Sequence, residues 1–244
     1  MPKSRAEPKV SRSDRVKANR VALMRAAADL IGERGYEETS VGRITERAGL
    51  AHGTFYRYFE SRQDLFDELL PTVGNELLQQ LRARVSGARD VLDLEERGFR
   101  GFFDFLVEHP GFYRLLNEAE TAAPAAFQEH IDNLARHYVS ALERSRARGE
   151  LPGFEARELE VLAFILMAAR FYIYLRFSKV EGGAGPIPDW VVAAYMKFVT
   201  FGLAGAPPER TRKSAPEADG TSERAATRRR RSTSRSRASG ETQQ

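Results

Sequence analysis

The stretch TSVGRITERAGLAHGTFYRYFESR, residues 39–62, decides the fold. Its first half has apolar or small residues at helical spacing from Val41 to Ala48, and its second half, residues 52–59, repeats phenylalanines four residues apart. Gly49 separates the halves at a point where a helix end needs a residue that tolerates positive φ. Two short helices joined by a glycine turn predict a helix-turn-helix, whose second helix lies in the major groove of DNA.

Composition limits the classes of protein to consider. The 244 residues include 42% hydrophobic residues and no cysteine, so we expect one sizeable domain or two small ones without disulfides or thiolate metal sites. Residues 1–20 are charged and lack the apolar segment of a signal peptide. The longest apolar run, Val161–Ala169, is well below the roughly 18 residues that suggest a membrane span. We therefore expect a cytoplasmic protein that makes no membrane contact and joins the nucleoid when it binds DNA.

Charge is distributed unevenly along the chain. Residues 1–62 hold 13 Lys/Arg against 8 Asp/Glu, residues 63–204 hold 15 against 21, and residues 205–244 hold 10 against 5. Because duplex DNA is a polyanion, a basic end can dock on it while an acidic body is held away. The alternative is that the basic ends are simply solvated, and the neighbouring helix-turn-helix pattern favours the first interpretation.

Helical periodicity extends along most of the chain, which predicts an all-α fold of about nine helices. We expect them at residues 19–34, 41–48, 52–59, 65–85, 90–108, 112–120, 125–148, 155–177 and 189–203. Pro71 should interrupt or kink the fourth helix, because proline blocks a backbone hydrogen bond. Residues 1–18 are expected to form a flexible basic arm, and residues 205–244, which lack apolar periodicity, a disordered basic tail.

Specific motifs add a family resemblance. The segment LIGERGYEETSV, residues 30–41, and the segment ITERAGLAHGTFYRYFESRQDLFDELL, residues 44–70, together resemble the DNA-binding domain of the TetR family of bacterial transcriptional regulators. The match runs almost continuously over residues 20–70. It implies a helix-turn-helix DNA-binding domain at residues 19–66 and an effector-binding and dimerisation domain at residues 67–204.

The resemblance implies DNA contacts at matching positions, and each has a physical reason. A serine hydroxyl and tyrosine suit phosphates, side chains at the start of the second motif helix reach base edges, and arginines suit either. These residues are Ser40, Arg43, His52, Gly53, Thr54, Tyr56, Arg57 and Arg62. Apolar residues of the same stretch should instead hold the helices together: Ile44, Ala48, Leu50, Phe55 and Phe59. Tyr58 is expected to pack as well, although the family often has a histidine there.

Two helices near the end of the sequence are apolar on almost every side. Residues 155–177 and 189–203 have almost no polar face, and a helix of that kind has to be buried all round. Paired across two copies, they would form a four-helix homodimer interface. The alternative is a monomer in which both helices are central, and the family resemblance favours the homodimer.

Aromatic residues are abundant in the acidic body, where the resemblance implies an effector site. The candidate lining residues are Phe99, Phe102, Phe103, Phe112, Phe127, Phe164, Arg170, Phe171 and Tyr172. Aromatic stripes at helical spacing are also typical of a plain core, so both interpretations stay open for each residue. Arg170, which follows a long apolar run, is predicted to bind a ligand carboxylate, to pair with an acid on another helix, or to extend to the surface. The aromatics favour an apolar, aromatic or fatty-acyl small molecule.

Features of an enzyme are few. The four histidines lack metal-site spacing, and the sequence has no nucleophile elbow or glycine-rich phosphate loop, so we expect neither catalysis nor a cofactor or metal. The leading hypothesis is a homodimeric repressor that an effector releases from a pseudo-palindromic operator of double-stranded DNA. Two alternatives are a non-specific DNA-compacting protein that uses its basic tails, including the run Arg228–Arg231, and an effector-free regulator. Activation instead of repression also stays open.

Overall fold

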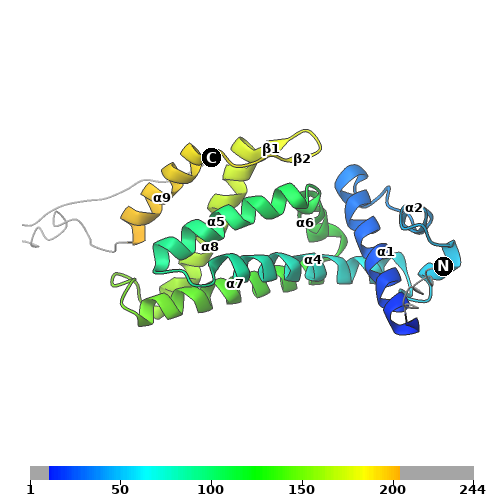
Figure 1. The fold of residues 1–244 in the computed structure, drawn as a ribbon, viewed down its shortest axis with the longest axis horizontal. Coiled ribbons are helices and arrows are strands. Elements are labelled where there is room, and N and C mark those ends of the chain that lie inside the picture. The colour runs from blue at the N-terminus through cyan, green and yellow to red at the C-terminus, as the bar shows by residue number, and fades with distance from the viewer. Residues whose placement is uncertain (1–10, 204–244) are drawn as a thin grey trace, which may run out of the picture. The chain divides into compact units, whose positions relative to one another are not determined.

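The computed structural model describes residues 11–203, which form nine α-helices and one two-stranded hairpin (Figure 1). This confirms the predicted all-α class. The helices are α1 Arg12–Arg34, α2 Val41–Arg47, α3 His52–Phe55, α4 Arg62–Val85, α5 Val91–Glu108, α6 Phe112–Ala122, α7 Pro124–Ala147, α8 Leu159–Ile173 and α9 Asp189–Leu203. The predicted tail, residues 205–244, and the first ten residues of the predicted arm lie outside the described residues.

Helix α1 begins earlier than expected. Ser11 caps it, and its hydroxyl accepts a hydrogen bond from the backbone N–H of Asp14 at 3.1 Å. Residues 12–18 are therefore helical, so the prediction of a flexible arm that reaches residue 18 is wrong for that part. The inner face of α1 buries Leu23, Ala27 and Ile31, and the helix contacts α2, α4 and α6. We call α1, α2 and α3 the head.

Helix α4 joins the head to the remaining helices, which we call the body. It runs unbroken through Pro71, so the expected interruption does not occur. The predicted domain boundary at residues 66–67 falls inside this helix, and head and body belong to one compact unit. A single hydrophobic core extends from α1 to α9.

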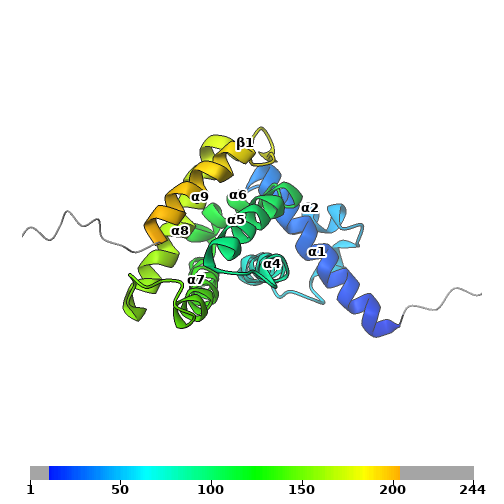
Figure 2. The ribbon, with the colours of Figure 1, turned by 60° about the vertical axis from the view of Figure 1, so that its left-hand side comes forward.

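In the body, α4 packs between α5 and α7, while α8 packs on α7 and α9 on α5 (Figures 1 and 2). The helix expected at residues 155–177 is continuous from Ala156 to Ser178 but changes its type along its length. It begins as a 3-10 turn at Ala156–Glu158, continues as α8, and ends as a π-helical turn at Tyr174–Ser178. An antiparallel hairpin follows, β1 Lys179–Val180 and β2 Gly183–Ala184. Helix α9 lies on the far side of the body from the head in both views.

Candidate DNA-binding surface and ligand cavity

The helix-turn-helix is held by local contacts of the predicted kind. The Ser40 hydroxyl caps α2 by accepting a hydrogen bond from the Arg43 N–H at 3.3 Å, and Gly49 has the positive φ of 68° that its turn requires. Leu50 is half-buried between the helices. Helix α3 is shorter than expected, because its regular part ends at Phe55 and the chain reaches Phe59 through tighter turns.

The two faces of this segment divide as the sequence predicts. Phe55 and Phe59 are fully buried with their ring centroids 5.5 Å apart. Among the five predicted contact residues between positions 52 and 57, Thr54 is half-buried and the other four are exposed: His52, Gly53, Tyr56 and Arg57. Space around Gly53 is open, so a DNA backbone or base edge can approach it closely. The DNA contacts of these residues remain predictions.

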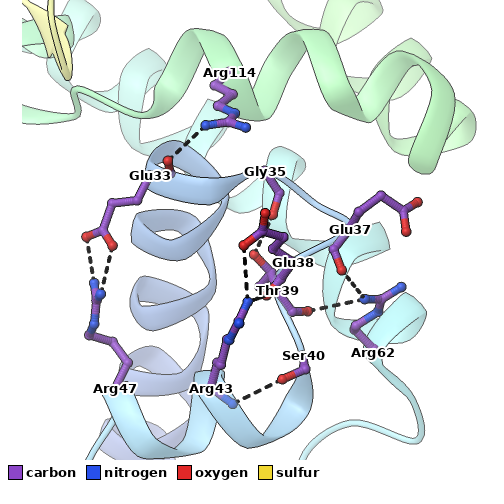
Figure 3. A network of polar contacts seen from close by, with 10 residues as sticks. All are labelled: Glu33, Gly35, Glu37, Glu38, Thr39, Ser40, Arg43, Arg47, Arg62 and Arg114. Atoms are coloured by element: carbon purple, nitrogen blue, oxygen red, sulfur yellow. Dashed lines mark hydrogen bonds and ion pairs between the residues drawn. The ribbon is translucent and has the colours of Figure 1, made fainter.

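Two predicted DNA-binding arginines already have partners within the head (Figure 3). The Arg43 guanidinium donates to the Glu38 carbonyl at 2.5 Å. Arg62 donates to the carbonyls of Glu37 and Thr39 at 3.4 Å each, and its guanidinium lies over the Tyr36 ring. Arg62 therefore holds the segment between α1 and α2 in place, a positioning role that the sequence did not indicate. Its phosphate contact remains a prediction.

An ion pair between an arginine and a glutamate joins α1 to α2. Arg47 donates two hydrogen bonds of 2.8 Å to the Glu33 carboxylate (Figure 3). These hydrogen bonds hold the pKa of Glu33 below its usual value. Because both side chains are largely exposed, we expect this pair to orient α2 and to add little to stability.

The head contacts the body through α1 and α6. Gly32 and Gly111 meet so closely that a Cβ atom added at Gly32 would lie 2.5 Å from the Gly111 Cα. Beside them Arg114 donates to the Glu33 carbonyl at 2.9 Å (Figure 3), and the Tyr36 N–H donates to the Glu118 carboxylate. Helix α6 is thereby fixed to the end of α1.

The body encloses a cavity of about 700 Å³ bounded by α4, α5, α6, α7 and α8. Its walls are mainly apolar, and six leucines and five phenylalanines are among the lining residues. Six of the nine predicted lining residues are among them: Phe102, Phe112, Phe127, Phe164, Arg170 and Phe171.

The other three candidates, Phe99, Phe103 and Tyr172, are not among the residues that line the cavity. Phe99 is fully buried and stacks on Tyr195 with ring centroids 4.1 Å apart, and Phe103 is buried against Phe99, so both belong to the packed core. Tyr172 is 69% exposed because it points outward from α8. For Phe99 and Phe103, helical periodicity predicted burial correctly but not which neighbour covers the side chain.

Arg170 forms a buried ion pair, one of the three roles that the sequence left open. Its Nη2 donates to Glu95 Oε1 at 2.6 Å, and its Nη1 donates to the Leu166 carbonyl. Glu95 also accepts hydrogen bonds from the hydroxyls of Tyr138 and Tyr195. Burial is the largest single influence on Arg170 and lowers its pKa. The Glu95 carboxylate and the hydroxyls of Tyr138 and Tyr195 together outweigh burial, so the net shift of the pKa is upward.

Comparison with known proteins places the head in a family. The model described as "Bacterial regulatory proteins, tetR family" matches residues 23–69. The HTH-type transcriptional regulator YhgD of Bacillus subtilis is 23% identical over 184 residues, which are 75% of this chain and 95% of YhgD. The chain belongs to the TetR family. It is therefore a DNA-binding transcriptional regulator.

Solved structures of TetR regulators share the fold beyond the head. A TetR-like transcriptional regulator from Rhodococcus sp. RHA1 superimposes with a TM-score of 0.58 at 22% identity, covering 77% of this chain and 97% of that one. The fatty acid degradation regulator FadR from Bacillus halodurans has a TM-score of 0.59 at 18% identity, covering 76% and 94%. These likenesses establish the fold of the body as well as the head.

TetR regulators act as dimers on DNA operators, and this chain carries an apolar surface that suits a dimer. One face of α8 and α9 packs in the core, while the other exposes large apolar side chains, with Phe198 65% and Phe201 82% exposed. The remaining members of this face, which we call the α8–α9 face, are Val161, Ile165, Tyr172, Leu175, Phe177 and Trp190.

One helical stretch of the described residues, Ala156–Ser178, is long and apolar enough to cross a membrane, judged on length and composition alone. Core helices of soluble proteins meet the same criterion. This stretch holds the buried Arg170 and contributes five of the eight residues of the α8–α9 face, and both features suit packing against protein.

Sequence reasoning missed the polar residues of the cavity. Glu95 lies in the apolar stripe of α5 that also contains Val91 and Phe99, and His130 lies in the stripe of α7 between Phe127 and Leu134. A polar residue inside such a stripe was the available signal, because burial of a polar group requires a partner or a ligand.

Proposed function

We propose that this TetR regulator is a homodimeric repressor that leaves a pseudo-palindromic operator when a small apolar, aromatic or fatty-acyl molecule enters the body. The observation that carries the proposal is the cavity of about 700 Å³, which lies against α4, the helix that carries the head. A cavity of this size with mainly apolar walls is typical of small-molecule sites.

Two helices connect the cavity to the head. Leu77, Leu78 and Leu81 of α4 line the cavity, and α4 starts next to the helix-turn-helix. Helix α6 lines it with Phe112 and Tyr113, among others, and touches α1 on its other side. A ligand that binds one arrangement of these helices more tightly than another shifts the population of head positions.

The α8–α9 face supports the homodimer. Exposed apolar residues on two adjacent helices suit a four-helix interface between two copies, and such an interface fixes the distance between two heads. Paired heads would bind half-sites one helical turn of DNA apart, which explains a pseudo-palindromic operator. We place the protein in the bacterial cytoplasm, on the nucleoid when it is bound.

The effector class follows from the cavity walls and is broad. A protein of the same fold regulates fatty acid degradation, which agrees with a fatty-acyl effector, but 18% identity does not choose among the three classes. The alternative of a non-specific DNA-compacting protein depends on the basic tail, which lies outside the described residues.

Footprinting tests the proposal. The full chain should protect a symmetric site, on its own promoter or elsewhere in the genome, with strongly salt-dependent affinity. Mass spectrometry of gently purified protein should show a dimer and any retained ligand. A chain without residues 205–244 should keep operator specificity, whereas loss of most binding would favour DNA compaction. The absence of any protected symmetric site would overturn the proposal.

A matched pair of glycine variants tests the route to the head. Gly32→Ala places a Cβ within 2.5 Å of Gly111 and should separate α1 from α6, whereas Gly53→Ala meets open space in α3. We expect Gly32→Ala to retain ligand binding and to change the ligand concentration that releases DNA. Gly53→Ala should alter DNA affinity without altering the response to ligand. An unchanged ligand response in Gly32→Ala would exclude the α1–α6 contact as part of the route.

A further inference from the structure

His130 is one of two buried side chains of the cavity whose polar atoms have no hydrogen-bond partner among residues 11–203; the other is Tyr113. His130 is 4% exposed and lines the cavity, and it makes no hydrogen bond to any of residues 11–203. Over the same residues, no fully enclosed side-chain nitrogen or oxygen lacks a partner. The ring nitrogens of His130 must therefore reach the cavity space, because otherwise they would count among such atoms.

His130 lies at the end of the cavity nearer the head. Helices α4 and α7 run parallel, since Gly74 meets His130, Asn75 bonds to Asn133, and Arg82 meets His137. The cavity lining on α7 extends from Phe127 to Arg144, a span of about 25 Å at 1.5 Å per residue. The basic lining residues Arg82 and Arg144 thus lie toward the far end of the cavity.

The surroundings of His130 are uncharged. Its ring packs on the backbone of α4 at Gly74, where an added Cβ would lie 2.2 Å from Nδ1, and its edge faces the Phe112 ring. Asn117 and Glu120 of α6 also line the cavity, but both are exposed and belong to its rim. Burial lowers the pKa of His130 to about 4, so the imidazole is neutral at neutral pH.

We propose that His130 selects the effector by bonding to an uncharged oxygen group, a hydroxyl or a carbonyl, carried by an otherwise apolar molecule. A neutral imidazole offers one N–H donor and one acceptor nitrogen, which suits either group. A pure hydrocarbon would leave the ring unpartnered in a dry site, and a carboxylate would find no positive charge there. Because the ring rests on Gly74, a bonded ligand is fixed against the helix that carries the head.

This inference rests on the proposed ligand-responsive function and narrows its effector class. The test uses three probes of equal chain length: 1-decanol and 2-decanone, which carry the oxygen group, and 1-chlorodecane, which lacks a strong hydrogen-bonding group. Binding to the full chain is measured by calorimetry. Histidine labelled with nitrogen-15 reports on the His130 ring directly by NMR.

The native protein should bind 1-decanol and 2-decanone about three- to tenfold more tightly than 1-chlorodecane, the range expected for one hydrogen bond. His130→Leu should lose this preference, and His130→Gln should keep part of it. His109→Leu serves as the control, because His109 stacks on Phe105 and is not part of the cavity lining. The nitrogen signals of His130 should shift when 1-decanol is added.

An equal affinity of the native protein for all three probes would overturn the inference, as would failure of all three to bind. A preference that persists in His130→Leu, or unshifted His130 signals, would do the same. The NMR result on the native protein decides the matter even if His130→Leu does not fold. None of these measurements uses DNA. A failure of the repressor proposal, which footprinting would show, is therefore distinguishable from a failure of this inference.

Discussion

The strongest test of the body is to break the ion pair between Glu95 and Arg170. The side chains are 2% and 9% exposed, and Glu95 accepts hydrogen bonds from Arg170, Tyr138 and Tyr195. Glu95→Gln keeps the shape of the side chain but leaves the Arg170 charge buried without an opposite charge. Removing one partner of such a pair costs about 3–5 kcal/mol, and we expect that loss in the free energy of unfolding.

Urea unfolding measures this loss, at one fixed protein concentration because dimer stability depends on concentration. The double variant Glu95→Leu with Arg170→Met removes the unpaired charge and should recover part of the stability, although the Tyr138 and Tyr195 hydroxyls lose their acceptor. Asp104→Asn is the control: the Asp104–Arg84 pair also joins two helices, α4 and α5, at 2.7 Å, but both side chains are exposed, so its loss should cost less than about 1 kcal/mol.

The reasoning would be refuted by a loss of less than about 1 kcal/mol in Glu95→Gln, because the pair would then behave as a surface pair. It would also be refuted if the double variant were less stable than the single variant. Either outcome would mean that water reaches Glu95 and Arg170 through the cavity and replaces the lost partner.

Three further predictions concern DNA, pH and assembly. Tyr56→Phe should weaken binding to all DNA sequences alike, whereas Thr54→Ala should change preference at one base step by about 1–3 kcal/mol; equal losses on every sequence in gel-shift titrations would contradict this. The pKa of His130 is lowered from 6.5 to about 4 in the folded state, so the unfolded chain takes up the proton first. Stability should therefore fall by about 3 kcal/mol as pH drops from about 6.5 to 4, measured by urea unfolding, and His130→Gln should remove that part of the fall. Phe201→Glu places a charge on the α8–α9 face and should shift the protein from dimer to monomer in analytical ultracentrifugation, while an unchanged dimer would place the interface elsewhere.

The head was predictable from the sequence because its determinants are local. Ser40 caps the helix that follows it directly, Gly49 supplies positive φ at its own position, and Phe55 meets Phe59 four residues away. The early start of α1 also had a local signal that was overlooked, since Ser11 followed by Asp14 three residues later is typical of a helix N-terminus.

The body was predictable only in outline, because its decisive contacts join residues far apart in the sequence. Whether a phenylalanine of α5 lines the cavity or fills the core depends on what lies opposite, and for Phe99 that is Tyr195 of α9. The change from α-helix to π-helical turn after Ile173 is accompanied by hydrogen bonds that join Ser178 to Gly185. Helical periodicity contains no information about such partners.

The polar residues that lie in apolar helix stripes differ in how many hydrogen-bond partners the fold gives them. Glu95 and Arg170 are polar groups in apolar stripes, and the fold gives each of them partners, so their contribution to the body is structural. His130 is equally buried, yet its nitrogens are left to the cavity. A ligand that fills the cavity without bonding to His130 leaves the ring unpaired, which costs about 1–3 kcal/mol, whereas a ligand with a matching polar group avoids that cost. The effector specificity of this regulator is therefore best sought at His130, where the protein leaves a hydrogen bond to be completed.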